Sequence, residues 1–575
     1  MTPRIERRVL TTEPVRLSGM SSLVSRVLVG RGITDPKGVT YSLSELQPFQ
    51  SLKDIDSAAA LLVDAISTQK HILVVGDYDA DGATSCAVAI RGLRMLGANN
   101  VDFLIPNRLE YGYGLTPEIV EVALNMGPDL IVTVDNGISS VEGVAAAQRS
   151  GVPVLVTDHH LPADELPKAA AIVNPNQPGC GFPCKSTAGV GVMFYVLMAT
   201  RAKLRDNGWF NNETQPNMAQ LLDLVALGTV ADLVPLERNN RLMVAQGIAR
   251  IRQGRCQLGI KALLEVANRE IQRTTTADFS FVVAPRLNAA GRISDMSLGV
   301  RALLTDESTE AADLAVELDK LNRQRREIES EMHGTAFTYL EGLGSLHPDK
   351  DSPVGVCLFD ESWHPGVIGI LASKVKALVH RPVIAFAPGG DDCLRGSARS
   401  IEGFHMRDAL ETINRDHPKL LARFGGHAMA AGLTITTKDY ASFATVFNET
   451  AAGLLSQDQL AGVIRSDGAL KPSELTLEMA DELAAMGPWG QGFPEPLFDG
   501  EFLIEQCQLL KQRHLKIVLR HLDSPTPLNG IYFNVDPGLD TQSLTRAKIV
   551  YRLEPNEFLG NRSLNLVIEH LVPIE

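Results

Sequence analysis

The sequence predicts an α/β protein of several domains: a doubly wound parallel-sheet lobe, a long linking helix, a second α/β lobe and a small C-terminal β-barrel. Three patterns support this prediction. Fully apolar runs alternate with amphipathic stretches, a long uninterrupted helical pattern follows, and short strand-like runs with turn signals come last. A length of 575 residues is enough for about three to four such domains.

The first lobe is predicted from apolar runs of strand length, which occupy residues 71–76, 101–106, 130–134 and 153–157. The stretches between them, such as 83–97 and 116–127, have helical length and one apolar face. Strands that are apolar on both faces are typical of a parallel sheet covered by helices on each side. A helical stretch at 219–236 is expected near the end of this lobe, which closes near residue 260.

A long helix and a second lobe follow. Residues 307–340 contain no proline, are rich in helix formers and carry apolar residues at helical spacing, so one long helix is expected there. The second lobe begins with a strand at 353–360 and continues with a strand at 382–388. Between them, a helix is expected to start at Pro365 and Gly366.

Beyond about residue 460 the pattern changes to short strand-like runs, for which a small barrel is the simplest fold. These runs occupy residues 515–520, 528–534, 548–554 and 563–571. The expected divisions of the chain are an N-terminal segment 1–45, a first α/β domain 46–265, a connecting region 266–345 with the long helix, a second α/β domain 346–458 and a barrel domain 459–575.

Composition limits the classes of protein. Apolar residues make up 45% and charged residues 21%, which is typical of a globular protein and argues against a fibre or a disordered chain. Lys and Arg number 54 against 68 Asp and Glu, for a net charge of −14. Nucleic acid would therefore have to bind at a local basic groove or through metal cations.

The cysteines and the apolar stretches bear on location. Seven scattered cysteines and a charged start without an apolar signal segment favour a reducing cytoplasm. Cys180 and Cys184 form a lone C-x3-C pair, for which a loop with free thiols is favoured over a zinc site. The longest uncharged apolar stretch, 186–200, is shorter than the roughly 20 residues that a bilayer requires, so no membrane association is expected.

Acidic side chains and histidines follow three of the expected strands. They are Asp77, Asp79 and Asp81 after the first strand, Asp135 after the third, and Asp158, His159 and His160 after the fourth. A further acid, Asp232, lies within 228–235. Because ligands of open parallel sheets bind beyond the carboxyl ends of the strands, these side chains are expected at one rim.

So many carboxylates at one rim would repel one another unless cations lay between them. Oxygen ligands with one or two imidazoles suit Mn²⁺ or Mg²⁺ better than zinc, and more than four anionic ligands indicate two ions. Each motif alone has a simpler explanation: D-x-D-x-D-G resembles a calcium-loop fragment, Asp-Asn-Gly is usually a turn, and paired histidines are often surface residues. Position 12 counted from Asp77 is Val88, which excludes the calcium loop.

Together, the motifs GDYDADG at 76–82, VDNGIS at 134–139, TDHH at 157–160 and GTVADLVPL at 228–236 resemble the DHH phosphoesterase superfamily, and within it the single-strand-specific 5′→3′ DNA exonucleases. Residues 286–292, 363–369, 396–400 and 425–432 are similar to the DHH-associated region. The resemblance covers the chain from about residue 45 onward. It implies metal-dependent hydrolysis of single-stranded DNA to 5′-mononucleotides in DNA repair, including mismatch repair, and in recombination.

The resemblance also implies roles for individual residues. The metal ligands would be Asp79, Asp81, Asp135, His159 and Asp232, with Asp135 shared by two ions, Mn²⁺ or Mg²⁺. Asp77 and Asp158 would lie beside these ligands. His160 would face the scissile phosphate, where a histidine can stabilise developing charge or protonate the leaving 3′ oxygen.

Contacts to the strand follow partly from the residues and partly from the resemblance. Residues 395–400 and 425–432 are expected to be glycine-rich loops, which either form anion nests or are ordinary turns. By resemblance, Arg108, Ser397 and Arg399 would hold the 5′ phosphate. Further phosphate contacts are implied for Arg286, Asn288, Arg292 and His427.

The segment 511–521 is basic and has a period of two. This pattern places Leu515, Ile517 and Leu519 on one face of a strand, and His514, Lys516 and Arg520 on the other. A barrel with this basic surface is compatible with an oligonucleotide-binding fold, although a solvated strand face is the alternative. Trp489, Tyr532 and Phe533 are candidates for base stacking or for core packing.

The expected partner is single-stranded DNA, and the family implies a single-strand-binding protein and a helicase as further partners. A small-molecule phosphodiesterase acting on cyclic dinucleotides or short oligonucleotides is the second hypothesis, which gives the barrel no role. A non-enzymatic DNA scaffold is the third, although a scaffold has no need of so repulsive a set of acids.

Overall fold

The structure of the protein, a computed structural model, describes residues 3–9, 16–107, 111–211, 214–342, 352–511, 513–535, 539, 541, 544–558 and 561–574. The chain folds as two compact units. Unit 1 comprises Met1–Ile5, Ala289–Asp295 and Glu317–Ile464. Unit 2 comprises Glu6–Asn288, Met296–Val316 and Arg465–Glu575.

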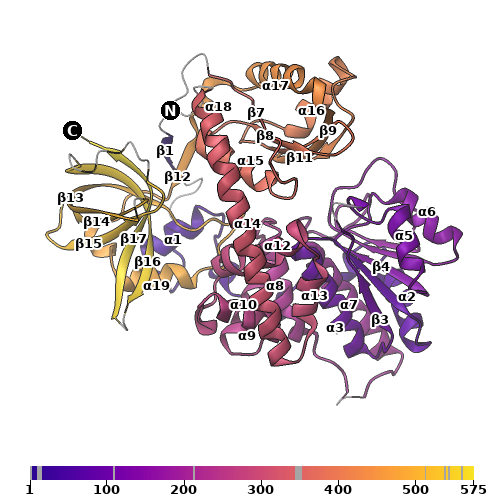
Figure 1. Ribbon diagram of the computed structural model, residues 1–575. Helices are drawn as coiled ribbons and strands as arrows, with labels where there is room; N and C mark the ends of the chain where they lie inside the picture. Colours follow the sequence, from indigo (N-terminus) through magenta and orange to yellow (C-terminus); the bar gives the residue numbers. More distant parts are fainter. Residues whose placement is uncertain are drawn as a thin grey trace. The chain divides into compact units, whose positions relative to one another are not determined.

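A five-stranded sheet, entirely parallel, forms the first lobe of unit 2 (Figure 1). In spatial order its strands are β3 (Val101–Leu104), β2 (Ile72–Gly76), β4 (Leu130–Val134), β5 (Val154–Thr157) and β6 (Ala171–Val173). The central strands are buried on both faces, as their uninterrupted apolar runs predict. The four strands expected in this lobe are therefore confirmed, and β6 is an additional strand.

Helices cover both faces of this sheet, which makes the lobe doubly wound as predicted. On one face, Leu73, Val75 and Ile131 pack against α5 (Pro117–Leu124) and α6 (Val141–Arg149). The other face is covered by α3 (Ala80–Leu96) and α7 (Gly189–Asp206), and α2 (Ile55–Ser67) lies against α7 and β6.

The helical part of unit 2 continues the lobe. Its elements are α8 (Leu222–Ala231), α9 (Arg238–Arg252), α10 (Leu258–Val266), α11 (Thr276–Asp278), a π-helical turn (Phe279–Val283), the start of α12 (Ala284–Ile293) and α13 (Ser297–Leu304). Helix α8 is buried on all sides, so its sequence lacks an amphipathic pattern. The expected helical stretch 219–236 is shorter in the structure: α8 begins at Leu222, after a 3₁₀ helix at Met218–Leu221, and ends at Ala231, where a turn follows.

Unit 1 is built on a second five-stranded sheet, in the order β10 (Arg423–Gly426), β11 (Ala430–Thr436), β9 (Cys393–Arg399), β8 (Val383–Pro388) and β7 (Val356–Phe359). Only β7 and β8 are parallel. The predicted long helix is confirmed as α14 (Ser308–Gly342). Its residues Met332 and Leu340 pack with α15 (Ile368–Val379) on one side of the sheet, and α16 (Met406–Asp416) and α17 (Tyr440–Leu454) form a core on the other.

Three expectations for unit 1 are wrong. Residues 395–399 are not a loop but the main part of β9, which pairs with β8 and β11. Gly396 serves close packing there, because a Cβ would lie 2.6 Å from the Phe386 ring and 2.8 Å from Leu433. Similarly, 425–432 is mostly the β10–β11 hairpin, and α15 begins at Ile368 rather than at Pro365.

The C-terminal module is a closed barrel in the order β13 (Phe498–Leu510), β14 (His514–His521), β15 (Pro527–Tyr532), β17 (Asn561–Pro573) and β16 (Arg546–Phe558). The period of two in β14 is confirmed, because Leu515, Ile517 and Leu519 are all fully buried. A bulge in β13 between Ile504 and Gln506 bends that strand around the barrel.

The N-terminal residues of unit 2 are tied to the segment that leads into the barrel. Arg31 donates two hydrogen bonds to the carboxylate of Asp467, at 2.7 and 2.9 Å, and both side chains are buried. Arg7 makes a similar pair with Asp499. The helix α1 (Ser22–Val29) lies between these two arginines in the sequence, while β1 (Arg4–Arg7) pairs with β12 (Val463–Ser466). The domain boundaries given above stay a prediction.

Over the described ranges, none of the helices combines the length and the apolarity that crossing a bilayer would require.

The barrel face assignments predict unequal effects of two neighbouring substitutions on β14. Ile517→Ala removes a fully buried side chain and is expected to destabilise the barrel by about 2–5 kcal/mol. Lys516→Ala, on the exposed face, is expected to stay within about 0.5 kcal/mol of the parent. Urea unfolding followed by tryptophan fluorescence and circular dichroism measures both, and equal effects would contradict the assignment of the two faces.

Candidate metal centre

Acidic and imidazole side chains from four elements converge at the carboxyl edge of the parallel sheet. The residues follow β2, β4, β5 and the C-terminus of α8. In three groups, one ligand atom from each member lies within 4.8 Å of the others: Asp77 with Asp79 and Asp135; Asp81 with His159 and Asp232; and Asp135 with His159 and His160. The rim predicted from the strand ends is therefore present.

The first three aspartates occupy the turn from β2 into α3. Asp79 is the N-cap of α3, and its carboxylate accepts a hydrogen bond of 3.0 Å from the Gly82 amide, as N-cap aspartates do. A Cβ on Gly82 would lie 2.4 Å from the Asp77 carbonyl oxygen. The glycine of this motif is therefore needed for the close approach that brings Asp77 and Asp81 to the same side.

Asp81 lies at the N-terminus of a second helix, α7. Its carboxylate accepts hydrogen bonds from the amides of Gly189, at 2.8 Å, and Val190, at 3.1 Å, which is the favourable end of the helix dipole. Burial nevertheless raises the pKa of Asp81 to about 7, and the neighbouring charge of Asp79 adds to this effect. A cation beside these carboxylates would reverse that effect.

Asp135 is held in a strained position at the end of β4. Its φ of 61° lies in the left-handed region, and Asn136 fixes the turn by donating to the carbonyls of Val75 and Val134, at 3.1 and 2.9 Å. The carboxylate oxygen Oδ1 is buried and accepts no hydrogen bond from the described residues. Burial and the charge of Asp81 raise the pKa of Asp135 well above its ordinary value. A buried acceptor of this kind needs a cation or a proton.

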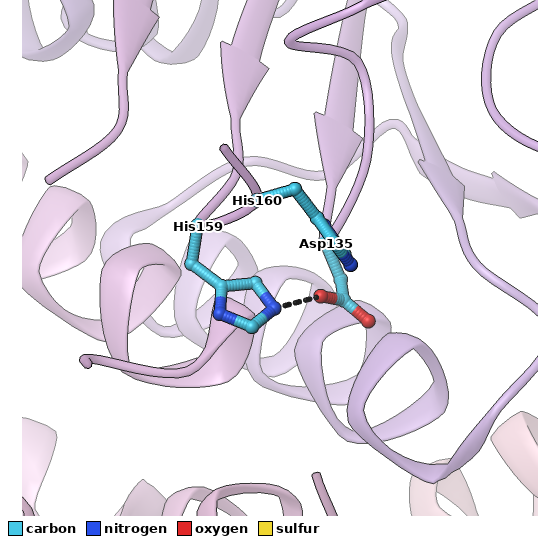
Figure 2. Close-up of side chains that lie close together, drawn as sticks. All are labelled: Asp135, His159 and His160. Atoms are coloured by element: carbon cyan, nitrogen blue, oxygen red, sulfur yellow. Dashed lines mark ion pairs between the residues drawn. The ribbon is translucent and has the colours of Figure 1, made fainter. Parts of the chain in front are cut away.

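Figure 2 shows the ring of His159 pointing at the carboxylate of Asp135. The Nε2 atom lies 3.1 Å from Asp135 Oδ1 and 3.5 Å from Asp232 Oδ2. Burial, followed by the charge of Asp81, also raises the pKa of Asp232 well above its usual range. One imidazole nitrogen among several carboxylates is a donor set that fits Mn²⁺ or Mg²⁺. The residues present therefore fit a pair of divalent cations.

The zinc alternative finds no support in this structure. The sulfur of Cys184 lies 3.7 Å from the Asn240 side-chain oxygen, whereas that of Cys180 lies 3.9 Å from the Ser51 carbonyl. Within the described ranges, the groups suited to a metal ion contain no cysteine. Neither thiol is in a disulfide.

Asp158 differs from the other acids because protein donors occupy it. Its carboxylate accepts hydrogen bonds from the amides of Ile138, His159 and His160, and from His160 Nδ1 at 2.8 Å. Although burial opposes this, these donors and the His160 charge lower the pKa of Asp158. The same contact, outweighing burial, raises the pKa of His160 to about 9. Asp158 therefore orients His160, and it belongs to none of the three groups above.

Tyr113 is a residue of this site that the sequence did not single out. Its hydroxyl lies 3.1 Å from His160 Nδ1 and 3.4 Å from the Asp135 carbonyl oxygen. The rings of Tyr113 and His160 meet edge to face, with centroids 5.7 Å apart. Tyr113 lies in the same motif, 106–114, as Arg108, which falls outside the described residues. The sequence could therefore have pointed to Tyr113 through the position of this motif directly after a strand of the sheet.

The motif 286–292 forms most of α12 and divides between the two units. In unit 2, Asn288 Oδ1 accepts a hydrogen bond of 2.8 Å from the Ala80 amide, beside Asp79 and Asp81. Arg286 is buried there and donates to the Val282 carbonyl. In unit 1, Arg292 donates to the Gly366 carbonyl.

In unit 1, Arg399 is held by a small polar cluster. It donates to the hydroxyls of Ser397 and Ser373, both at 3.1 Å. A Cβ on Gly369 would lie 2.9 Å from Arg399 Nη2 and 3.0 Å from Ser397 Oγ, so the first turn of α15 lies directly against both side chains. An arginine beside a helix N-terminus suits phosphate. His427 is exposed at the turn of the β10–β11 hairpin.

The barrel residues also have partners. His514 Nδ1 accepts a hydrogen bond from the Asn534 amide, and Arg520 pairs with Glu505 at 2.7 Å, whereas Lys516 is exposed. Of the aromatic candidates, Trp489 is stacked on Phe493 at 4.9 Å. Phe533 is 49% exposed and meets His514 edge to face. Tyr532 is half-buried.

This combination of a parallel-sheet lobe, an acidic and imidazole centre, a second α/β lobe and a barrel defines a DHH-type phosphoesterase. Residues 71–229 match the DHH family, N-terminal domain, residues 351–453 match the DHHA1 domain, and residues 466–570 match the RecJ OB domain. The chain belongs to the RecJ family. It is 50% identical to the single-stranded-DNA-specific exonuclease RecJ of Escherichia coli (strain K12), over 96% of each chain.

More distant relatives agree with this assignment. The chain is 35% identical to the single-stranded-DNA-specific exonuclease RecJ of Bacillus subtilis (strain 168), over 96% of this chain and 68% of that one. Among solved structures, it resembles RecJ in complex with Mn²⁺ from Thermus thermophilus, with a TM-score of 0.79 and 30% identity over 97% of this chain and 76% of the other. RecJ in complex with Mg²⁺ from the same organism gives a TM-score of 0.73 at 29% identity, over 97% and 75%.

The raised carboxyl pKa values predict that Mn²⁺ stabilises the protein more at pH 8 than at pH 6. Without metal, Asp81 keeps a proton that the unfolded chain loses above about pH 4. The resulting stability is therefore lost as pH rises through about 7. Metal binding requires the deprotonated ligands, so the Mn²⁺-induced rise in melting temperature should grow over this range. Asp135→Asn should abolish that rise, whereas Asp102→Asn, on β3 of the same sheet, should keep it.

Gly189 predicts a second effect on metal binding. A Cβ at this position would lie 2.5 Å from Asp135 Oδ1 and 2.7 Å from Asp135 Cβ, so Gly189→Ala should displace that carboxylate. We expect Mn²⁺ affinity, measured by calorimetry, to fall about 10- to 100-fold. Gly334→Ala, in an open part of α14, should leave affinity unchanged, and the assignment of Asp135 would be refuted if the two variants bound Mn²⁺ equally well.

Proposed function

We propose that this chain is a metal-dependent exonuclease specific for single-stranded DNA, which works 5′→3′ and releases 5′-mononucleotides in DNA repair and recombination. One observation carries the proposal: carboxylates from the ends of β2 and β4 and from α8 meet an imidazole from β5 at distances suited to metal ligation. The relatives named single-stranded-DNA-specific exonuclease RecJ support the choice of substrate.

The residues that would hold two divalent cations, Mn²⁺ or Mg²⁺, are Asp79, Asp81, Asp135, His159 and Asp232, with Asp135 shared between the ions. Asp77 lies within reach of the same group. When bound, such ions lower the pKa of water and neutralise the oxygens of a phosphodiester. The buried carboxylates of this chain supply the negative charge that fixes the ions, and the N-terminus of α7 orients Asp81.

His160 is the proposed proton donor to the leaving 3′ oxygen. Its Nδ1 is engaged by Asp158, so Nε2 is the nitrogen that would face the substrate. The hydrogen bond to Asp158 raises the pKa of His160 and keeps its ring protonated at neutral pH, which suits a general acid. Tyr113, whose hydroxyl contacts the same ring, would limit its rotation. Asp158 and Tyr113 therefore act as positioning residues.

Specificity for a strand with a 5′ end requires groups that hold a terminal phosphate. We assign this role to Ser397 and Arg399, which Ser373 supports, and to Arg108. The guanidinium fork matches two phosphate oxygens at once. Further contacts to the strand are proposed for Asn288, Arg286 and His427.

The barrel would bind the strand beyond the active site. Lys516 and the exposed ring of Phe533 beside His514 offer charge and a stacking surface, the two features that sequence-tolerant strand binding uses. Arg520 would give up its ion pair with Glu505 and pair with a phosphate of the strand instead. The alternative substrate, a cyclic dinucleotide or short oligonucleotide, needs no such surface.

The division of labour follows the expected domains: 46–265 for catalysis, 346–458 for the terminal phosphate and 459–575 for the strand, linked by 266–345. The N-terminal segment 1–45 would brace the barrel through Arg7 and Arg31. We further propose a single-strand-binding protein and a helicase as partners, because a nuclease of this specificity depends on exposed strands. Seven free thiols suit action in a reducing compartment.

The proposal is tested with 5′-labelled single strands, blunt duplexes and a cyclic dinucleotide, each with Mn²⁺ or EDTA. Labelled mononucleotide should appear only from single strands with Mn²⁺. Asp81→Ala should retain strand binding and lose cleavage. His160→Ala should lower kcat by about 10²- to 10⁴-fold, whereas His417→Ala, an exposed residue after α16, should not. Turnover of the cyclic dinucleotide alone would favour the alternative substrate.

A further inference from the structure

Leu233 directly follows Asp232 of the metal centre and has two unusual properties. Its side chain is 64% exposed, although leucine is normally among the buried residues. Its φ of 60° lies in the left-handed region, which a leucine rarely adopts. Both properties are unfavourable for stability.

The fold alone does not require a leucine here. Helix α8 ends at Ala231, with Asp232 as its C-cap, so Leu233 occupies the next position, where helices commonly place a left-handed glycine. A glycine would adopt this backbone without strain and would expose no apolar surface. Because strained and exposed residues persist where they serve a site, Leu233 is a functional candidate.

The surrounding chain holds Leu233 in place. Its amide donates to the Val230 carbonyl at 3.3 Å, and the amide of Leu236 donates to the Gln491 carbonyl at 2.7 Å. The side chain of Asn240 donates to the Pro235 carbonyl at 2.9 Å. Hydrogen bonds therefore hold the backbone on both sides of Leu233, so the Cα of this exposed side chain has a fixed position next to Asp232.

A second exposed leucine has an equivalent position. Leu161 directly follows His160 and is 57% exposed. Asn174 Nδ2 donates to the His160 carbonyl at 2.9 Å and thereby fixes the backbone directly before Leu161. Since His159 Nε2 lies 3.5 Å from Asp232 Oδ2, the two leucines follow residues of one centre. Two members of this acidic centre are thus each followed directly in the chain by an exposed leucine, whose side chain cannot bind metal.

We propose that Leu233 packs against a nucleobase next to the scissile phosphodiester and thereby positions the strand for cleavage. The inference rests on the proposed function, because it places the scissile phosphate at the Asp232 centre. An aliphatic side chain can pack on the face of any base, so this contact favours nucleotides without selecting a sequence. Leu161 would extend the same apolar border.

The test compares strands that carry an abasic residue at the first or second position with the same strands carrying a base. Wild type should cleave the base-bearing strand better at one of these positions. Leu233→Gly should lower kcat/KM on the base-bearing strand about fivefold, as expected for the loss of a partly buried leucine contact, and should cleave both strands alike. Leu233→Met should preserve the wild-type preference.

Stability separates this role from a structural one. Leu233→Gly should melt at or above the wild-type temperature, because it removes strain. Leu233→Asn, polar but tolerant of the left-handed region, should lose the base preference in the same way. Leu454→Ala, which removes an exposed leucine at the end of α17, should keep it.

Two results would overturn the inference while leaving the exonuclease intact. One is an unchanged ratio of base-bearing to abasic cleavage in Leu233→Gly and Leu233→Asn. The other is a clear fall in the melting temperature of Leu233→Gly, which would mean that the leucine packs within the protein. If wild type fails to cleave any single strand, the proposed function itself is wrong, and this outcome is distinct from the other two.

Discussion

Mutual repulsion among buried carboxylates is the constraint on which the first lobe depends. Asp81, Asp135 and Asp232 are all driven toward the protonated state by burial and by one another. The fold holds them together by backbone means: two strand ends, the C-terminus of α8, the amides of α7 and glycines that admit close approach. The close carboxylates lower the stability of the metal-free protein, and the same arrangement allows the protein to bind divalent cations there.

Asp158 and Asp135 show how the surroundings of an aspartate determine its role in this site. The Asp158 carboxylate accepts hydrogen bonds from three backbone amides and from an imidazole. It therefore remains charged without a metal, and it orients His160. Asp135, one strand away, has an oxygen that accepts no backbone amide from the described residues and lies 3.1 Å from His159 Nε2. The chemical difference between them therefore comes from the geometry of the loops after β4 and β5, since both residues are aspartates at the end of a buried strand.

Much of the fold and the centre of the site follow from the sequence. The apolar runs mark the strands, their ends place the acids, and the period of two in 514–521 gives the buried face of β14. The features that the sequence did not predict correctly are those that depend on tertiary contacts. Gly396 looks like a turn residue but avoids the Phe386 ring, and Tyr113 and Ser373 gain their roles only from partners far along the chain. The strain at Leu233 is likewise visible only in the backbone.

The buried pair of Arg31 and Asp467 joins residues 436 positions apart, and Arg7 and Asp499 are 492 apart. During translation, these arginines leave the ribosome long before their acidic partners are made. The segment that carries them must wait through most of synthesis without its binding surface, with the apolar face of α1 accessible to chaperones and proteases. Maturation of this chain is therefore completed from its two ends together, after the interior domains have had time to fold.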